Sequence, residues 1–248
     1  LDYEDYLAYA SDINRYCKDV HITPVCFCTG ADFLRCDDIK AEIQRVKKNV
    51  DVAAAYGCTI LRHDVSAGFH DLANDDGDYD NAIEIIAPAI RSITLYAKEK
   101  GILTTTENHG FFSQDSGRIK KLISAVNEKN FGALIDIGNF SCVDEENISA
   151  TQNLAPMAYH AHVKDFYVKD RSAEDLGAGW FKTRGRNHQK GAIFGQGDLP
   201  VNKCIAALKN GGYNGYLTLE FEGLEDPAYS VELGYRNLTN ALAEMEVG

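Results

Sequence analysis

The sequence feature that most constrains the fold is a regular alternation of short apolar strands with amphipathic helices. One long helix is predicted from apolar residues that recur every three or four positions, at Ile39, Ile43, Val46, Val50 and Ala53. Gly57 ends this helix, and the apolar segment 58–63 follows as a strand. A chain that repeats this order favours a parallel sheet covered by helices.

The alternation continues to the C-terminus. Strands are expected at 21–28, 58–63, 102–107, 132–136, 157–163 and 216–220. Helices are expected at 7–18, 39–57, 81–98, 117–127, 145–153, 199–210 and 229–245. The segment 165–197 shows no periodicity, so we expect a long loop there, either a lid that offers cations and aromatic rings to the substrate or a solvated loop with incidental charges.

The number of predicted strands suggests an incomplete barrel. Six strands are expected, whereas a closed (β/α)8 TIM barrel has eight. The sequence begins at Leu1 without a methionine and enters a helical pattern at once. We therefore expect one α/β domain over residues 1–248, a TIM barrel that lacks its first two strands in this chain. No Pro/Gly/Ser-rich linker divides it.

Composition narrows the classes of partner. The 37 acidic residues outnumber 25 basic ones, and the net charge of −12 opposes a nucleic-acid partner. No apolar run reaches the ~20 residues that span a bilayer, and there is no secretory leader pattern, so we expect a cytoplasmic protein without a membrane partner. The seven cysteines contain no C-x-x-C pair, which favours reduced thiols.

Ionisable residues occur at the ends of four predicted strands. They are Glu107, Asp136, His162 and Glu220. The carboxyl ends of parallel barrel strands open onto one mouth, so these side chains are expected to converge there. Three carboxylates and an imidazole repel one another unless a cation lies between them. A ligand set made mainly of oxygen donors favours Mn²⁺, with Mg²⁺, Co²⁺ or Zn²⁺ as alternatives. Taken alone, each of these residues is more often a helix cap or a solvated strand end.

The motifs around these residues resemble the xylose isomerase-like TIM-barrel superfamily of sugar phosphate isomerases and epimerases. The resemblance extends from about Cys58 to the C-terminus through the segments 107–110, 136–139, 160–165 and 215–220. It implies that the four residues bind one divalent metal. It also implies that Glu107 and Glu220 are the catalytic pair that removes and returns a proton beside a carbonyl.

Several residues near these strand ends are expected to contact a carbohydrate substrate: Arg62, His109, Asn139, Lys164 and Trp180. By strand alternation His63 points to the opposite face and is expected to be packed or half-exposed, while His160 lies one layer below His162. Glu222, nearer the loop than Glu220, is expected at the rim.

The substrate, the reaction and the oligomeric state are left open by the sequence. Asn139 stands where related ketose 3-epimerases carry histidine, and 166–169 lacks their arginine, so the substrate and its phosphorylation are open. The same apparatus eliminates water in an inosose-dehydratase-like lyase. A non-catalytic sugar-binding barrel and a homo-oligomer are also compatible, whereas the endonuclease IV group needs additional histidines.

Overall fold

A computed structural model of the chain describes residues 2–69 and 79–247. They divide into two compact units, each described by itself below. The first comprises Leu1–Ser113 and Arg118–Leu134, and the second comprises Gln114–Gly117 and Ile135–Gly248.

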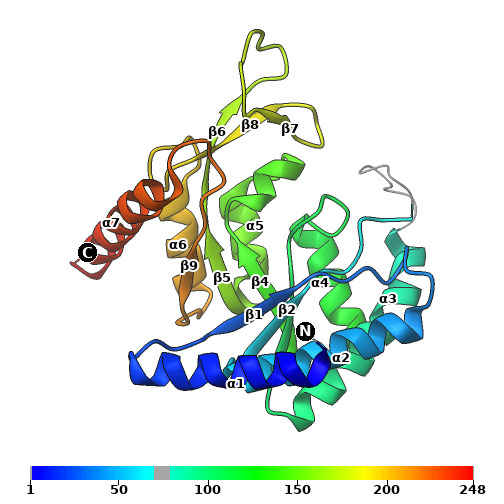
Figure 1. Cartoon of the computed structure of the whole chain (residues 1–248). Coiled ribbons are helices and arrows are strands. Elements are labelled where there is room, and N and C mark those ends of the chain that lie inside the picture. The colour runs from blue at the N-terminus through cyan, green and yellow to red at the C-terminus, as the bar shows by residue number, and fades with distance from the viewer. Residues whose placement is uncertain (1, 70–78, 248) are drawn as a thin grey trace. The chain divides into compact units, whose positions relative to one another are not determined.

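The first unit contains a parallel sheet with helices. Its strands follow the order β1 (Cys26–Thr29), β2 (Ile60–His63), β3 (Leu103–Glu107) and β4 (Phe131–Asp136), whose last two residues begin the second unit (Figure 1). The helices are α1 (Tyr3–Asp19), α2 (Ile39–Tyr56), α3 (Tyr79–Glu99) and α4 (Ser116–Val126). In the strand register, Glu107 lies beside Leu134.

Local signals explain where α2 begins and ends. The Asp38 side chain accepts hydrogen bonds from the backbone N–H groups of Lys40 and Ala41 and caps the first turn. Gly57 ends the helix in the left-handed conformation (φ 81°), which glycine adopts without steric cost. The apolar face predicted from the sequence is confirmed, because Val46, Val50 and Ala53 are fully buried in the core of this unit.

The second unit contains two further parallel strands, β5 (Ala158–Val163) and β9 (Leu217–Leu219), with His162 beside Thr218. Its helices are α5 (Asn147–Leu154), α6 (Val201–Asn210) and α7 (Pro227–Val247), with 3-10 turns η1 (Asn139–Val143) and η2 (Ala155–Met157). Across the described residues the parallel strands thus number six, as predicted for a partial barrel.

The prediction of a structureless loop over 165–197 is wrong. This segment forms an antiparallel sheet in the order β6 (Asp165–Lys169), β8 (His188–Ala192) and β7 (Phe181–Lys182) (Figure 1). Backbone pairing stabilises it, with Asp165 opposite Ala192 and Lys169 opposite His188. The sequence shows no regular apolar alternation here, because the apolar residues Phe166, Tyr167 and Val168 of β6 are adjacent and β8 is mostly polar.

The first predicted strand is shorter than expected. It was placed at 21–28, whereas β1 covers only Cys26–Thr29. His21 adopts a left-handed backbone conformation (φ 57°), and Pro24 has no N–H to donate to a strand ladder. None of the described helices is long and apolar enough to cross a bilayer.

Candidate active site

Three potential metal ligands converge in the second unit. Asp136 ends β4, His162 lies near the end of β5, and Glu220 directly follows β9. Each offers a donor atom, and these atoms lie within 4.8 Å of one another. Asp136 and His162 are buried, and the Glu220 side chain is 31 % exposed.

Backbone hydrogen bonds hold these residues at the strand ends. The Oδ1 atom of Asp136 accepts from the N–H groups of Gly138 (2.8 Å) and Asn139 (3.2 Å), which starts the η1 turn. The Glu220 N–H donates to the Val163 carbonyl at 3.0 Å and extends the pairing of β9 with β5. The carboxylates are therefore positioned by the sheet and its turns.

Lys164 places a buried ammonium group among the carboxylates of this unit. Its Nζ lies 2.8 Å from Oε2 of Glu220, 3.0 Å from Oε1 of Glu222 and 3.3 Å from Oδ2 of Asp136. Burial would lower the pKa of Lys164, but the three carboxylates outweigh it and raise the pKa. Gly138 permits this approach, because a Cβ there would lie 2.6 Å from Cγ of Lys164.

His162 and Glu220 form a close pair, with Nδ1 and Oε1 separated by 2.7 Å. Burial would raise the pKa of Glu220, but the hydrogen bond to His162 and the charge of Lys164 lower it to about 2. Glu220 is therefore a carboxylate at neutral pH, the form that binds cations and accepts protons.

The donor set of Asp136, His162 and Glu220 fits a divalent cation. Ligand atoms within 4.8 Å of one another can share one ion at ~2.0–2.5 Å from each. Two carboxylates and one imidazole suit Mn²⁺, Mg²⁺, Co²⁺ or Zn²⁺. A buried cluster of acidic residues and histidine in this chain can thus bind a metal.

Glu107 ends β3 in the first unit, where a buried arginine holds it. Arg62 Nε donates to Oε2 of Glu107 at 2.8 Å, and the other end of the guanidinium group lies 2.8 Å from Oδ1 of Asp64. The side chains of Arg62 and Glu107 are 10 % and 5 % exposed. Such a doubly engaged guanidinium group orients the carboxylate more firmly than a single contact would.

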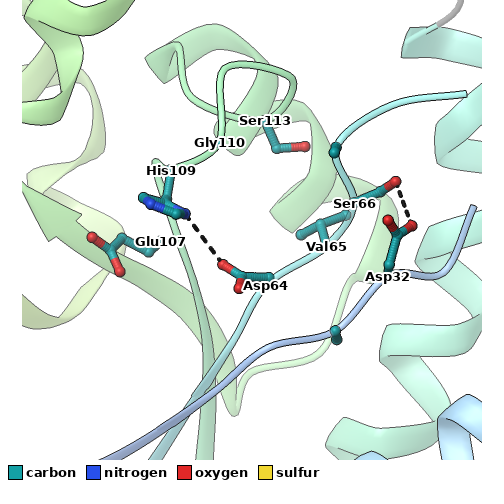
Figure 2. Close-up of a pocket in the computed structure, with 10 residues that line it drawn as sticks. Asp32, Asp64, Val65, Ser66, Glu107, His109, Gly110 and Ser113 are labelled. Carbon is teal, nitrogen blue, oxygen red and sulfur yellow. Dashed lines mark hydrogen bonds and ion pairs between the residues drawn. The ribbon is translucent and has the colours of Figure 1, made fainter. Parts of the chain in front are cut away.

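A pocket of about 200 Å³ opens beside Glu107 in this unit (Figure 2). Its polar lining comes from Asp32, Asp64, Ser66, His109 and Ser113 as well as Glu107. Ser66 Oγ donates to Oδ1 of Asp32 at 2.6 Å, and His109 Nδ1 lies 3.5 Å from Oδ1 of Asp64. The hydrogen bond to Asp64 is the main reason why the pKa of His109 is raised.

The structure also places the remaining predicted residues. His63 is fully buried between the rings of Phe33 and Phe131, as predicted. His160 is buried, with Nε2 at 2.8 Å from Thr218 Oγ1 and its ring centroid 5.4 Å from that of His162.

Asn139, Trp180 and Glu222 occupy different surroundings. Asn139 is buried in η1, where its carbonyl accepts from Gln114. Trp180 precedes β7, and the Lys169 Nζ atom lies 5.1 Å from the centroid of the Trp180 ring. The Glu222 side chain is half exposed, in agreement with a rim position. Substrate contacts of Arg62, His109, Asn139, Lys164 and Trp180 stay predictions.

Sequence reasoning missed the pocket residues Asp32, Asp64 and Ser66. A signal existed for Asp64, which directly follows β2 and shares the strand parity of Arg62. No comparable signal marked Asp32, which lies in the loop after β1. It also missed that Lys164 neutralises the carboxylates, because ion pairing between β5 and the segment after β9 depends on the tertiary fold.

Repeated βα units with acidic and histidine side chains at the carboxyl ends of parallel strands define an α/β-barrel protein with a candidate metal centre. The chain belongs to the xylose isomerase-like TIM barrel family, whose model matches residues 2–242.

Comparisons with individual proteins agree with this family. Inosose dehydratase of Clostridium perfringens is 26 % identical over 166 residues, 64 % of this chain and 54 % of the dehydratase. The matched region thus spans about half the length of this curated relative. Among solved structures, the IOLI protein with a bound zinc atom has a TM-score of 0.74 at 15 % identity, covering 95 % of this chain and 82 % of that one. The 3-keto-D-glucoside 4-epimerase of E. coli has a TM-score of 0.70 at 14 % identity, covering 96 % and 87 %.

Proposed function

We propose that this protein is a divalent-metal-dependent isomerase or epimerase that acts on a small sugar or sugar derivative. The observation that carries the proposal is the convergence of Asp136, His162 and Glu220 at the carboxyl ends of parallel strands. The names of similar proteins, an epimerase and a dehydratase of sugar-like molecules, support an enzyme of this type.

Glu107 is the fourth ligand in this proposal. It lies beside Leu134 in the register of β3 and β4, and Asp136 follows two residues later on the same strand. Both residues end a parallel strand, and the carboxyl ends of such strands carry the sites of barrel proteins, which supports Glu107 as a ligand. Mn²⁺ is the preferred ion, with Mg²⁺, Co²⁺ and Zn²⁺ as alternatives.

The proton-transfer residues in this proposal are Glu107 and Glu220. When bound, the divalent ion stabilises the negative charge that develops on the substrate oxygens as a proton leaves the adjacent carbon. Glu220 is ionised, since its pKa is lowered to about 2, and it can accept that proton. Arg62 orients Glu107 through Oε2. In this pair Glu220, as the carboxylate, removes the proton on one side, and Glu107, as the carboxylic acid, delivers a proton on the other.

A dehydratase is the second candidate. The 26 % identity with inosose dehydratase of Clostridium perfringens favours it. Elimination of water also begins with removal of a proton beside a carbonyl, and the carboxylic acid formed in that step, or the protonated form of His109, can then protonate the departing hydroxyl. A sugar-binding protein without catalysis is the remaining alternative.

A proton-exchange experiment separates these functions. The protein is incubated with Mn²⁺ and a panel of ketoses, keto-inositols and keto-glucosides in deuterated water. Deuterium in recovered substrate, together with an epimer or isomer, supports the proposal. Loss of water identifies a dehydratase, and unchanged C–H bonds with measurable binding identify a binding protein. Glu220→Gln is the test variant, and Asp37→Asn, at an exposed carboxylate, is its control.

A further inference from the structure

Two cysteines lie side by side on β1, the first strand in the order of the parallel sheet. Cys26 and Cys28 are separated by one residue, and their Sγ atoms are 3.9 Å apart. We propose that Cys26 and Cys28 form a redox-active dithiol, which a peroxide oxidises to a disulfide and a thiol reductant restores. This modification site lies outside the metal cluster, and the inference does not depend on the proposed function.

The geometry of the strand allows a bond between the two sulfur atoms. Alternate residues of a strand point to the same face, so both side chains extend from one face of β1. Two residues of strand separate the Cα atoms by about 6.6 Å, at the upper end of the ~4.4–6.8 Å range that disulfides span. Side-chain rotation can therefore close the gap while β1 stays paired with β2. A disulfide near the limit of this range is easily reduced, which suits a reversible modification.

The two thiols differ in a way that assigns their roles. Cys28 is exposed, whereas Cys26 is partly buried. The hydrogen bond to Cys28 and burial raise the pKa of the Cys26 thiol, so Cys26 keeps its proton. A hydrogen bond from this thiol favours the thiolate form of Cys28. The exposed thiolate is the sulfur that attacks peroxides, and Cys26 is the neighbour that resolves the product.

Arg62 connects this dithiol to the carboxylate at the end of β3. Cys28 lies beside Arg62 in the register of β1 and β2, and Arg62 Nε donates to Glu107 at 2.8 Å. Burial lowers the pKa of Arg62, but the negative charges of Glu107, Asp64 and the Cys28 thiolate raise it. Oxidation of Cys28 removes one of these charges. The modification therefore changes the surroundings of the guanidinium group that orients Glu107.

The oxidation balances as a two-electron reaction with hydrogen peroxide. The Cys28 thiolate attacks one peroxide oxygen, the O–O bond breaks, and the departing hydroxide takes up a proton to become water. Cys28 is then a sulfenic acid. The Cys26 sulfur attacks the Cys28 sulfur, the S–O bond breaks, and the departing hydroxide takes the proton of Cys26. Two thiols and one peroxide thus give one disulfide and two water molecules.

Cys36 offers a comparison within the same chain, because it is partly exposed and follows β1 closely. Burial raises the pKa of its thiol, and the negative charge of Glu42 raises it further. Since the thiolate is the reactive form, Cys36 should react with peroxide more slowly than Cys28.

The test is peptide mass spectrometry after exposure of the protein to equimolar hydrogen peroxide, followed by alkylation with N-ethylmaleimide. Trypsin releases residues 19–35 as one peptide, in which Cys26 and Cys28 are the only cysteines. We expect this peptide to lose two hydrogens and to take up no alkylating agent, and dithiothreitol to reverse the change. Cys36 lies in the next peptide and should stay open to alkylation, with oxidation at least about tenfold slower.

Two serine variants test the separate roles of the cysteines. In Cys26→Ser, dimedone should trap a sulfenic acid at Cys28, and longer exposure should add a second oxygen there. In Cys28→Ser, Cys26 should stay reduced at the same peroxide dose. Cys36→Ser is the control, and its Cys26 and Cys28 should still form the disulfide.

The result for the wild-type protein decides the inference without the variants. Alkylation of both Cys26 and Cys28 after peroxide treatment overturns it, as does a disulfide that joins either of them to another cysteine. Oxidation of Cys26 in Cys28→Ser at the wild-type rate also overturns it, because Cys28 would then not be the attacking thiol.

Discussion

The Lys164 ammonium nitrogen lies 2.8 Å from Oε2 of Glu220, and only 3 % of the lysine side chain is exposed. A residue that sequence alone suggests as a substrate contact is thus the internal counter-ion of the carboxylate cluster. The charge of Lys164 offsets the repulsion among the carboxylates of Asp136, Glu220 and Glu222, which stabilises the folded state. A divalent cation bound to Asp136 and Glu220 would be a second counter-ion for these carboxylates, beside Lys164.

Replacement of this counter-ion should make stability depend on metal. We expect Lys164→Met to lower the free energy of unfolding in EDTA by about 3 kcal/mol, because it leaves buried carboxylates without their cation. Mn²⁺ should restore most of the loss, which urea unfolding with and without the ion will measure. Lys169→Met, at an exposed position of β6, is the control. Equal stability of Lys164→Met and wild type in EDTA would contradict the counter-ion role.

Metal binding and proton transfer should separate in two variants. Glu220→Gln keeps an oxygen donor but removes the basic carboxylate, so proton exchange should fall by ~10²–10⁴ while part of the Mn²⁺ affinity remains. His162→Ala should chiefly weaken Mn²⁺ binding, and excess Mn²⁺ should recover activity. Exchange rates are measured against added Mn²⁺. If excess metal returned Glu220→Gln to wild-type turnover, Glu220 would be a ligand without a proton-transfer role.

Acid sensitivity should arise partly from His63. Burial lowers its pKa from 6.5 to about 4 in the folded protein. Between pH 4 and pH 6.5 the unfolded chain binds a proton at His63 that the folded chain does not. The stability that neutral His63 contributes to the folded protein is therefore complete above pH 6.5 and is lost as the pH falls to 4. The loss is about 3 kcal/mol. His63→Phe should remove it.

Urea unfolding at pH 7 and pH 4.5 will measure this difference. His63→Phe keeps an aromatic ring against Phe33 and Phe131, so its stability should change less between the two pH values than that of wild type. His188→Phe, at a partly exposed position of β8, provides the control and should follow wild type. Parallel pH dependence of wild type and His63→Phe would contradict the assignment to His63.

Asp144 should hold the segment before β8 in place. Its carboxylate accepts hydrogen bonds from Thr183 Oγ1 and Asn187 Nδ2, each at 2.8 Å, and its backbone is left-handed (φ 60°). Asp144→Ala loses these bonds and strains the backbone, so amide exchange over 183–187 should rise by about tenfold or more. Asp144→Asn, which tolerates this conformation and can still accept a hydrogen bond, should show a smaller rise. Unchanged exchange in Asp144→Ala would show that other contacts hold the segment.

The sequence by itself determined the βα order and the strand ends that carry the candidate ligands. Apolar spacing is a local property, so the buried face of α2 and the position of Asp136 at the end of β4 follow from it. Parity along each strand likewise separated the packed His63 from Arg62. These features depend on neighbours within a few residues.

Only the tertiary structure decided which charges meet. Lys164 and Glu222 are 58 residues apart, and Arg62 and Glu107 are 45 apart, so no local pattern reports their pairing. The sheet β6–β8–β7 also depends on backbone hydrogen bonds between distant segments, which no local apolar pattern reports. Electrostatic pairing and antiparallel register depend on distances in space, which is why Asp32, Asp64 and the ion pairs of Arg62 and Lys164 are seen only in the folded chain.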